Sequence, residues 1–209
     1  MIPRPLLSFA AVAAFAVVAP TGSFAADKFV ANLQPLNAAK IGTAAKGTAK
    51  LSIADGKLVT VIDLEGLPPG IMHLQHYHGF PDGKQAACPT ADADKNGDGY
   101  IDLIETEAVA GTTMVPFHAH PATLEIPNDT YPTADKSGAA HYTNTEVVAD
   151  IENALKDKFK SPVLALEKRV IFVHGVSEKP ALPDSVKSLP GVPAHVTLPI
   201  ACGTIEAEK

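Results

Sequence analysis

The chain is organised around one segment, Gly66-Leu67-Pro68-Pro69-Gly70-Ile71-Met72-His73-Leu74-Gln75-His76-Tyr77-His78-Gly79-Phe80. A Pro-Pro-Gly turn signal precedes an apolar run, which predicts an extended strand over Ile71–His78. Side chains alternate between the two faces of a strand, so His76 and His78 point to one face and His73 to the other. Two imidazoles on one rigid strand form half of a chelate for copper, zinc, iron or nickel. The alternative is that these histidines only end a strand at the surface.

The first 25 residues have the organisation of a signal peptide. Arg4 supplies a positive n-region, Leu6–Ala19 an apolar h-region and Ser23–Ala25 a small-x-small cleavage site. We therefore expect cleavage after Ala25 and an exported protein, periplasmic or secreted. No later segment is apolar over the length that a bilayer demands, so no membrane span is expected.

Composition limits what the rest of the chain can be. Removing 25 of the 209 residues leaves about 184, which suits one domain over 26–209. A net charge of −6, a pI near 5.7 and the lack of a basic run argue against a nucleic-acid partner. The chain contains two cysteines, Cys88 and Cys202, and an isolated pair in an oxidising compartment predicts one disulfide.

Short apolar runs broken by Gly, Pro and Asp predict a mainly β chain. The expected strands are Phe29–Leu36, Gly47–Ile53, Lys57–Leu64, Ile71–His78, Arg169–His174 and His195–Ile205. Asp55-Gly56 is a type I′ hairpin signal between two of them. In Glu146–Phe159, by contrast, apolar residues recur every four positions, which predicts one short surface helix. Pro180–Pro193 is expected to be a long loop.

A second metal motif, Asp94-Lys95-Asn96-Gly97-Asp98-Gly99-Tyr100-Ile101-Asp102-Leu103-Ile104-Glu105, matches the twelve-residue EF-hand loop at every position. The expected calcium ligands are the side chains of Asp94, Asn96, Asp98 and Glu105, the carbonyl of Tyr100, and a water held by Asp102. A helix is expected to follow over Leu103–Ala110, whereas the prolines in Gly79–Thr90 exclude an entering helix. In an exported protein this loop predicts a structural calcium site. The alternative is an acidic, solvated loop.

Four segments resemble the copper/zinc superoxide dismutase family, and the resemblance extends over nearly all of residues 26–209. Gly66–His78 is similar to the family's turn and its His-Gly-Phe-His-Val-His strand, and Thr133–Gly138 to its Thr-Ala-Asp-Lys-Asp-Gly loop. Val170–His174 resembles the strand that ends in the last copper histidine, and Ile200–Ile205 resembles the Leu-Ala-Cys-Gly-Val-Ile terminus. The resemblance implies an all-β, Greek-key β-barrel or sandwich, a disulfide between Cys88 and Cys202, and copper ligands at His76, His78 and His174.

The resemblance also implies a fourth copper ligand. His118-Ala119-His120-Pro121 is similar to the family's His-Phe-Asn-Pro, so His118 is the expected counterpart of the metal-bridging histidine, with His120 as its rival. In this reading His118 is the catalytic residue, which leaves the ion and passes on a proton when the ion is reduced.

Three departures from the family pattern bear on function. The segment between His120 and Thr133 contains no histidine, so no zinc site of the usual kind is expected. The EF-hand loop is an insertion, placed at 92–110. Pro199 stands where the family has the arginine that attracts and positions the superoxide anion, and Lys179 or Lys187 is a candidate to replace it.

The leading hypothesis is therefore an exported, copper-binding superoxide dismutase-like protein with a structural calcium site. It would convert superoxide to oxygen and hydrogen peroxide. One alternative is a copper-binding or copper-handling protein without turnover, as Pro199 suggests. Another is a calcium-stabilised structural module without a transition metal.

Overall fold

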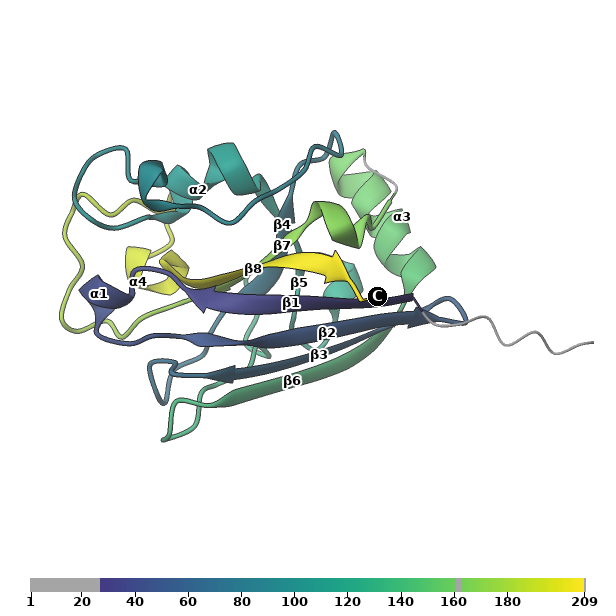
Figure 1. The fold of residues 1–209 in the computed structure, drawn as a ribbon, viewed down its shortest axis with the longest axis horizontal. Helices are drawn as coiled ribbons and strands as arrows, with labels where there is room; N and C mark the ends of the chain where they lie inside the picture. The colour runs from purple at the N-terminus through teal and green to yellow at the C-terminus, as the bar shows by residue number, and fades with distance from the viewer. Residues whose placement is uncertain (1–26, 161–162, 209) are drawn as a thin grey trace, which may run out of the picture.

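A computed structural model describes residues 27–160 and 163–208 (Figure 1). The expected signal peptide, 1–25, lies outside this part of the chain. The strands are β1 (Asp27–Pro35), β2 (Lys46–Ala54), β3 (Lys57–Glu65), β4 (Gln75–Gly79), β5 (Thr112–Pro116), β6 (Ala140–Val147), β7 (Val170–His174) and β8 (Pro199–Ala207). The α-helices are α1 (Ala38–Ile41), α2 (Leu103–Ala110), α3 (Val148–Phe159) and α4 (Ala194–Thr197), with 3-10 turns at Ala91–Ala93, Pro121–Thr123 and Leu166–Lys168.

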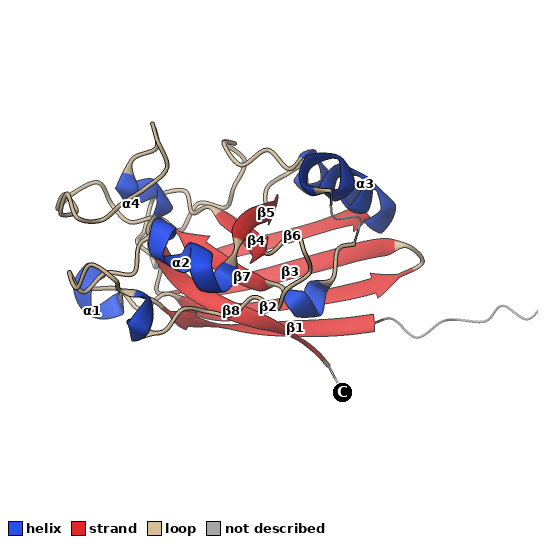
Figure 2. Ribbon diagram, turned by 90° about the horizontal axis from the view of Figure 1, so that it is seen from above, coloured by secondary structure: helices blue, strands red, loops and turns tan. Residues whose placement is uncertain are grey.

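The strands form one antiparallel sheet in the order β5-β4-β7-β8-β1-β2-β3-β6, which curves into a half-barrel with β5 and β6 at its edges. Figure 2 shows α1, α2 and α4 towards one end of the sheet and α3 towards the other. The mainly β class expected from the sequence is confirmed.

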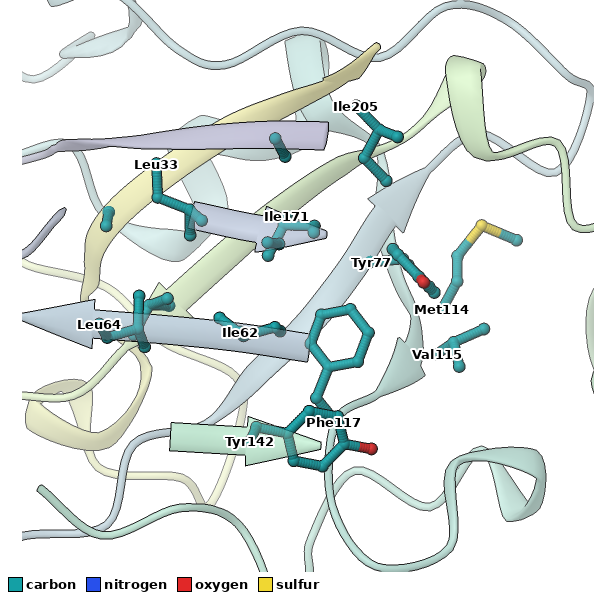
Figure 3. Close-up of a cluster of buried hydrophobic side chains, with 14 of the residues drawn as sticks. Leu33, Ile62, Leu64, Tyr77, Met114, Val115, Phe117, Tyr142, Ile171 and Ile205 are labelled. Carbon is teal, nitrogen blue, oxygen red and sulfur yellow. The ribbon is translucent and has the colours of Figure 1, made fainter. Parts of the chain in front are cut away.

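The hydrophobic core fills the concave side of the sheet (Figure 3). Alternate residues of strands far apart in the sequence meet there, among them Leu33, Ile62, Tyr77, Ile171 and Ile205. Each is at most 1% exposed. Burying a side chain of this size contributes roughly 1.5–3 kcal/mol, so this layer holds the two halves of the sheet together.

Both expected helices are present. The helix after the EF-hand loop is α2, with the predicted bounds, and α3 begins at Val148, two residues later than expected. In α3, Ile151 and Leu155 are each 1% exposed and join the core, whereas Val147 precedes the helix and is 43% exposed. The spacing of four residues therefore identified the buried stripe of this helix.

Two strand predictions need correction. The strand expected over Ile71–His78 begins at Gln75, because Met72 and His73 instead bond to the 132–133 segment. The strand expected over His195–Ile205 begins at Pro199, because the preceding residues form α4.

The edge strands β5 and β6 were not predicted. Only Tyr142 is buried in β6, so the hydrophobic alternation that identifies a half-buried strand is missing. The short strand β5 directly follows α2 after Gly111, and its first two residues are threonines. Edge strands are specified by their one partner strand more than by their own pattern.

The disulfide between Cys88 and Cys202 is confirmed, with a Cα–Cα distance of 5.8 Å and a sequence separation of 114. It fastens the segment after β4 to the central strand β8. Among residues 27–160 and 163–208, no helix has the length and apolarity needed to cross a membrane.

Candidate metal centre

Three histidines converge where β4 and β7 lie side by side. His76 and His78 come from β4 and His174 ends β7, which pairs with β4 in antiparallel register. Each offers a ligand atom within 4.8 Å of the others, so the three lie close enough to bind one metal ion. The register shifts between His76 and His78 and again at His174. A register shift changes the direction in which nearby side chains point. Here the shifts occur at the three histidines whose side chains point towards one another.

Two of these imidazoles have a ring nitrogen that is buried without any hydrogen-bond partner, Nδ1 of His76 and Nε2 of His174. The other nitrogen of His174, Nδ1, donates to the Thr197 carbonyl at 2.8 Å. That bond fixes the tautomer and leaves the Nε2 lone pair free, which is the arrangement that metal-binding histidines usually have. Unpartnered buried nitrogens are costly, so these two atoms are suited to ligate a cation.

His78 is held by the edge strand. Its Nδ1 lies 3.4 Å from the Gly111 carbonyl oxygen and its Nε2 lies 3.1 Å from the Thr113 hydroxyl. Both ring nitrogens of His78 thus have a partner, and a metal would take the Nε2 lone pair in place of the Thr113 hydroxyl. Thr113 and Thr197 orient ligands, and no sequence signal marks either of them.

Burial keeps all three histidines neutral at pH 7. It lowers the pKa of His78 to about 3 and that of His174 to about 4. The pKa of His76 falls well below its ordinary value, first through burial and then through repulsion from the neighbouring histidines. Only neutral imidazole ligates a metal, so the site needs no deprotonation before binding.

The expected fourth ligand lies outside this group. His118 is buried, its Nε2 lies 2.7 Å from the Glu125 carbonyl and its Nδ1 accepts the backbone N–H of His120 at 3.0 Å. Both ring nitrogens are thus engaged, and Tyr131 packs edge-on at 5.1 Å between ring centres. The side chain of the rival, His120, is exposed. The roles of His118 as ligand and as catalytic residue stay predictions.

His73 also lies outside the group, as expected, but it precedes β4, so alternation along that strand is not the reason. It is fully buried, with Nδ1 3.0 Å from the His174 carbonyl and Nε2 2.9 Å from the Pro68 carbonyl. It therefore joins the turn before β4 to the end of β7.

The EF-hand loop folds as a compact turn closed by its own side chains. Asp94 accepts the backbone N–H groups of Gly97 and Gly99, each at 2.8 Å. Glu105 accepts those of Lys95 and Asp102, at 2.8 and 3.1 Å. In the described residues no second group of three His, Cys, Asp or Glu side chains meets as the histidines do. Calcium binding by Asp94, Asn96, Asp98, Tyr100, Asp102 and Glu105 stays a prediction.

Two contacts that sequence reasoning missed dock this loop on the rest of the fold. The side chain of Asn37 accepts the Ile101 N–H at 2.8 Å and lies 2.9 Å from the carbonyls of Ile101 and Pro199. The buried Asp102 caps α2 and accepts the Lys187 N–H at 2.6 Å. The EF-hand loop is therefore tied to β8 and to the loop that follows β7.

A cavity of about 460 Å³ lies over the histidines and includes all three in its lining. Lys158 is the one cationic side chain that lines it in the described part of the chain, and Lys179 and Lys187 do not line it.

A comparison with protein-family models and a search of curated proteins both found no match to this chain. The likeness to superoxide dismutases therefore rests on the four sequence segments.

Proposed function

We propose that this protein binds copper through His76, His78 and His174, on a Greek-key fold of the superoxide dismutase type. The observation that carries the proposal is the convergence of these three buried, neutral imidazoles, two of them with an unpartnered nitrogen. Three nitrogen donors favour copper over calcium, magnesium or manganese, and copper binds such sites more tightly than the other divalent first-row metals.

The sheet supports the fold part of the proposal. The strand β6 pairs with β3, and β7 with β4, so connections pass over intervening strands as Greek-key connections do. The disulfide between the segment after β4 and β8 also agrees with the family arrangement.

Superoxide disproportionation is the second candidate function, and the observation that favours it is the cavity through which a small molecule reaches the histidines. A bound copper ion would supply the one-electron redox chemistry. Few positive side chains near the histidines could attract an anion in the described residues. Pro199 lies opposite His174 in the β7–β8 pairing, and the Lys158 ammonium is engaged by the Leu124 carbonyl at 2.6 Å. We therefore propose turnover well below that of an enzyme with a positioned arginine.

Metal titration of the purified protein tests copper binding. We expect one copper ion per chain, and His78→Ala or His174→Ala should lower the affinity by at least about 100-fold, because each removes one of three donors. His141→Ala is the control, since this exposed histidine pairs with Asp63 outside the site. Wild-type protein that binds no copper at micromolar concentration would contradict the proposal.

A superoxide assay of the copper-loaded protein tests the second candidate. Pro199→Arg should raise the rate and make it fall more steeply with salt, because the new charge attracts the anion. A copper-loaded protein that is inactive with and without this change would leave copper binding alone as the function.

We also propose that the EF-hand loop holds a calcium ion in a structural role. The side chains of Asp94, Asn96 and Asp98 each accept a backbone N–H within the loop, which orders three of the side chains expected to hold the ion.

A further inference from the structure

The cavity over the three histidines is far larger than superoxide requires. Its volume of about 460 Å³ falls in the range of roughly 300–1,000 Å³ that is usual for small-molecule sites. A superoxide anion would fill about one or two water volumes, ~30 Å³ each. The chain thus maintains room beside the proposed metal for a ligand of many atoms.

The walls of this cavity are mainly apolar. They come from segments far apart in the sequence: the residues before β4, the 126–127 segment, the end of α3, and α4 with the loop before it. They include Leu74, Ile126, Phe159, Leu189, Val192 and Val196. The charged side chains in the lining are Glu107 and Lys158, one of each sign, and Lys158 is already hydrogen-bonded. Such a wall recognises an apolar body rather than a charged one.

Apolar side chains also remain exposed at this cavity. Leu189 is 46% exposed and Met72 is 36% exposed, and both line it. They belong to the few large apolar residues that reach the surface in the described residues. Apolar exposure that borders a cavity marks a ligand site more often than a random surface position does.

Polar donors in the lining gather on the histidine side. His76, His78 and His174 line the cavity together with Thr113 and Thr197, which hold two of these rings. A ligand whose apolar body fills the rest of the cavity therefore meets the proposed metal only through an atom on that side.

We propose that the cavity binds a small organic molecule with an apolar aromatic or branched aliphatic body and one nitrogen, oxygen or sulfur atom that ligates the metal. The proposal rests on metal binding by the three histidines. The apolar wall selects the ligand, and the metal orients it.

Two related probes test this selection. Imidazole and 4-phenylimidazole are titrated into the copper-loaded protein, and binding is followed by the change in the visible absorption and electron paramagnetic resonance spectra of copper. We expect 4-phenylimidazole to bind about 10- to 100-fold more tightly than imidazole, because the phenyl group leaves water for the apolar wall. Equal affinities of the two probes would overturn the proposal.

Substitutions test which residues of the cavity wall favour 4-phenylimidazole over imidazole. Leu189→Ser should reduce the ratio of the two affinities several-fold, because it replaces an apolar contact by a hydroxyl. Val109→Ser is the matched control, since Val109 is 37% exposed on α2 but does not line the cavity, and it should leave the ratio unchanged. A ratio that responds equally to both changes would contradict this wall as the binding surface.

The metal-free protein separates this inference from copper binding. A neutral apolar dye such as Nile red should fluoresce more strongly with the metal-free wild type than with metal-free Leu189→Ser. If copper fails to bind while the dye binds in this way, the proposed function fails and the apolar site stands. If copper binds while neither the dye nor the phenyl group is favoured, the apolar site fails alone.

Discussion

Burial of the three histidines lowers the free energy of unfolding unless they bind a ligand. Two ring nitrogens without partners cost roughly 1–3 kcal/mol each, and neutral burial makes the rings resist protonation. A metal bound only by the folded chain would offset this cost, since ligand binding to the native state adds to its stability.

The histidines predict an acid-sensitive metal-free protein. In the folded chain the pKa values of His78 and His174 are about 3 and 4, against about 6.5 in the unfolded chain. Between pH 6.5 and 4 the unfolded state therefore binds protons that the folded state does not. Each of these histidines should lower the free energy of unfolding by about 1.4 kcal/mol per pH unit over this window.

Urea unfolding of chelator-treated protein at pH 7.5, 6.0 and 5.0 measures this slope. His174→Gln should reduce the slope by the contribution of one histidine. A free energy of unfolding that is constant from pH 6.5 to 5, or a slope unchanged in the variant, would contradict neutral burial of this residue.

Among the elements, α2 links the EF-hand loop to the cavity over the three histidines. It begins at the capping residue Asp102, and Leu103 and Glu107 of its first turns line the cavity. Asp102 also holds the loop before α4, and Thr197 at the end of that helix orients His174. The end of the EF-hand loop and the segment that leads to α4 are thus anchored on one buried carboxylate.

Removal of that carboxylate should loosen both elements. Asp102→Ala deletes a helix cap worth about 0.5–2 kcal/mol and leaves the Lys187 N–H without its acceptor, for a total loss of roughly 2–4 kcal/mol. Chemical unfolding without calcium isolates this effect from any metal effect. Asp102→Asn keeps only one of the two acceptor oxygens, so its loss should fall between that of Asp102→Ala and zero.

Calcium should stabilise the same element. We expect the melting temperature to rise on addition of millimolar calcium, and Glu105→Gln to remove most of the rise, because Glu105 is the expected bidentate ligand. Copper affinity should stay nearly unchanged in this variant. Identical melting curves of the wild type in calcium and in chelator would exclude a structural calcium site.

Over the whole molecule, the disulfide is the strongest single constraint on the unfolded chain. It closes a loop with a sequence separation of 114, for which the chain-entropy model gives about 4–5 kcal/mol. Reduction should lower the free energy of urea unfolding by an amount of this order. The Cys88→Ser, Cys202→Ser double variant should unfold at the midpoint of the reduced wild type, and equal midpoints of oxidised and reduced protein would contradict the prediction.

Local patterns in the sequence were enough to predict several elements of the fold and part of the histidine site. Alternation put His76 and His78 on one face of the strand, the spacing of apolar residues found α3, and the EF-hand sequence motif located the start of α2. Two cysteines allowed only one intramolecular disulfide. These features depend on neighbours in the chain, whose geometry is set by the helix and strand periods.

Only the tertiary structure decided which distant side chains meet. It brought His174 to His76 and His78 but engaged both ring nitrogens of His118 with backbone groups. It also made edge strands of two polar segments and assembled an apolar cavity from residues that no motif connects. The physical reason is that these arrangements depend on strand pairing and packing between distant segments, where one step in register changes which side chains face each other.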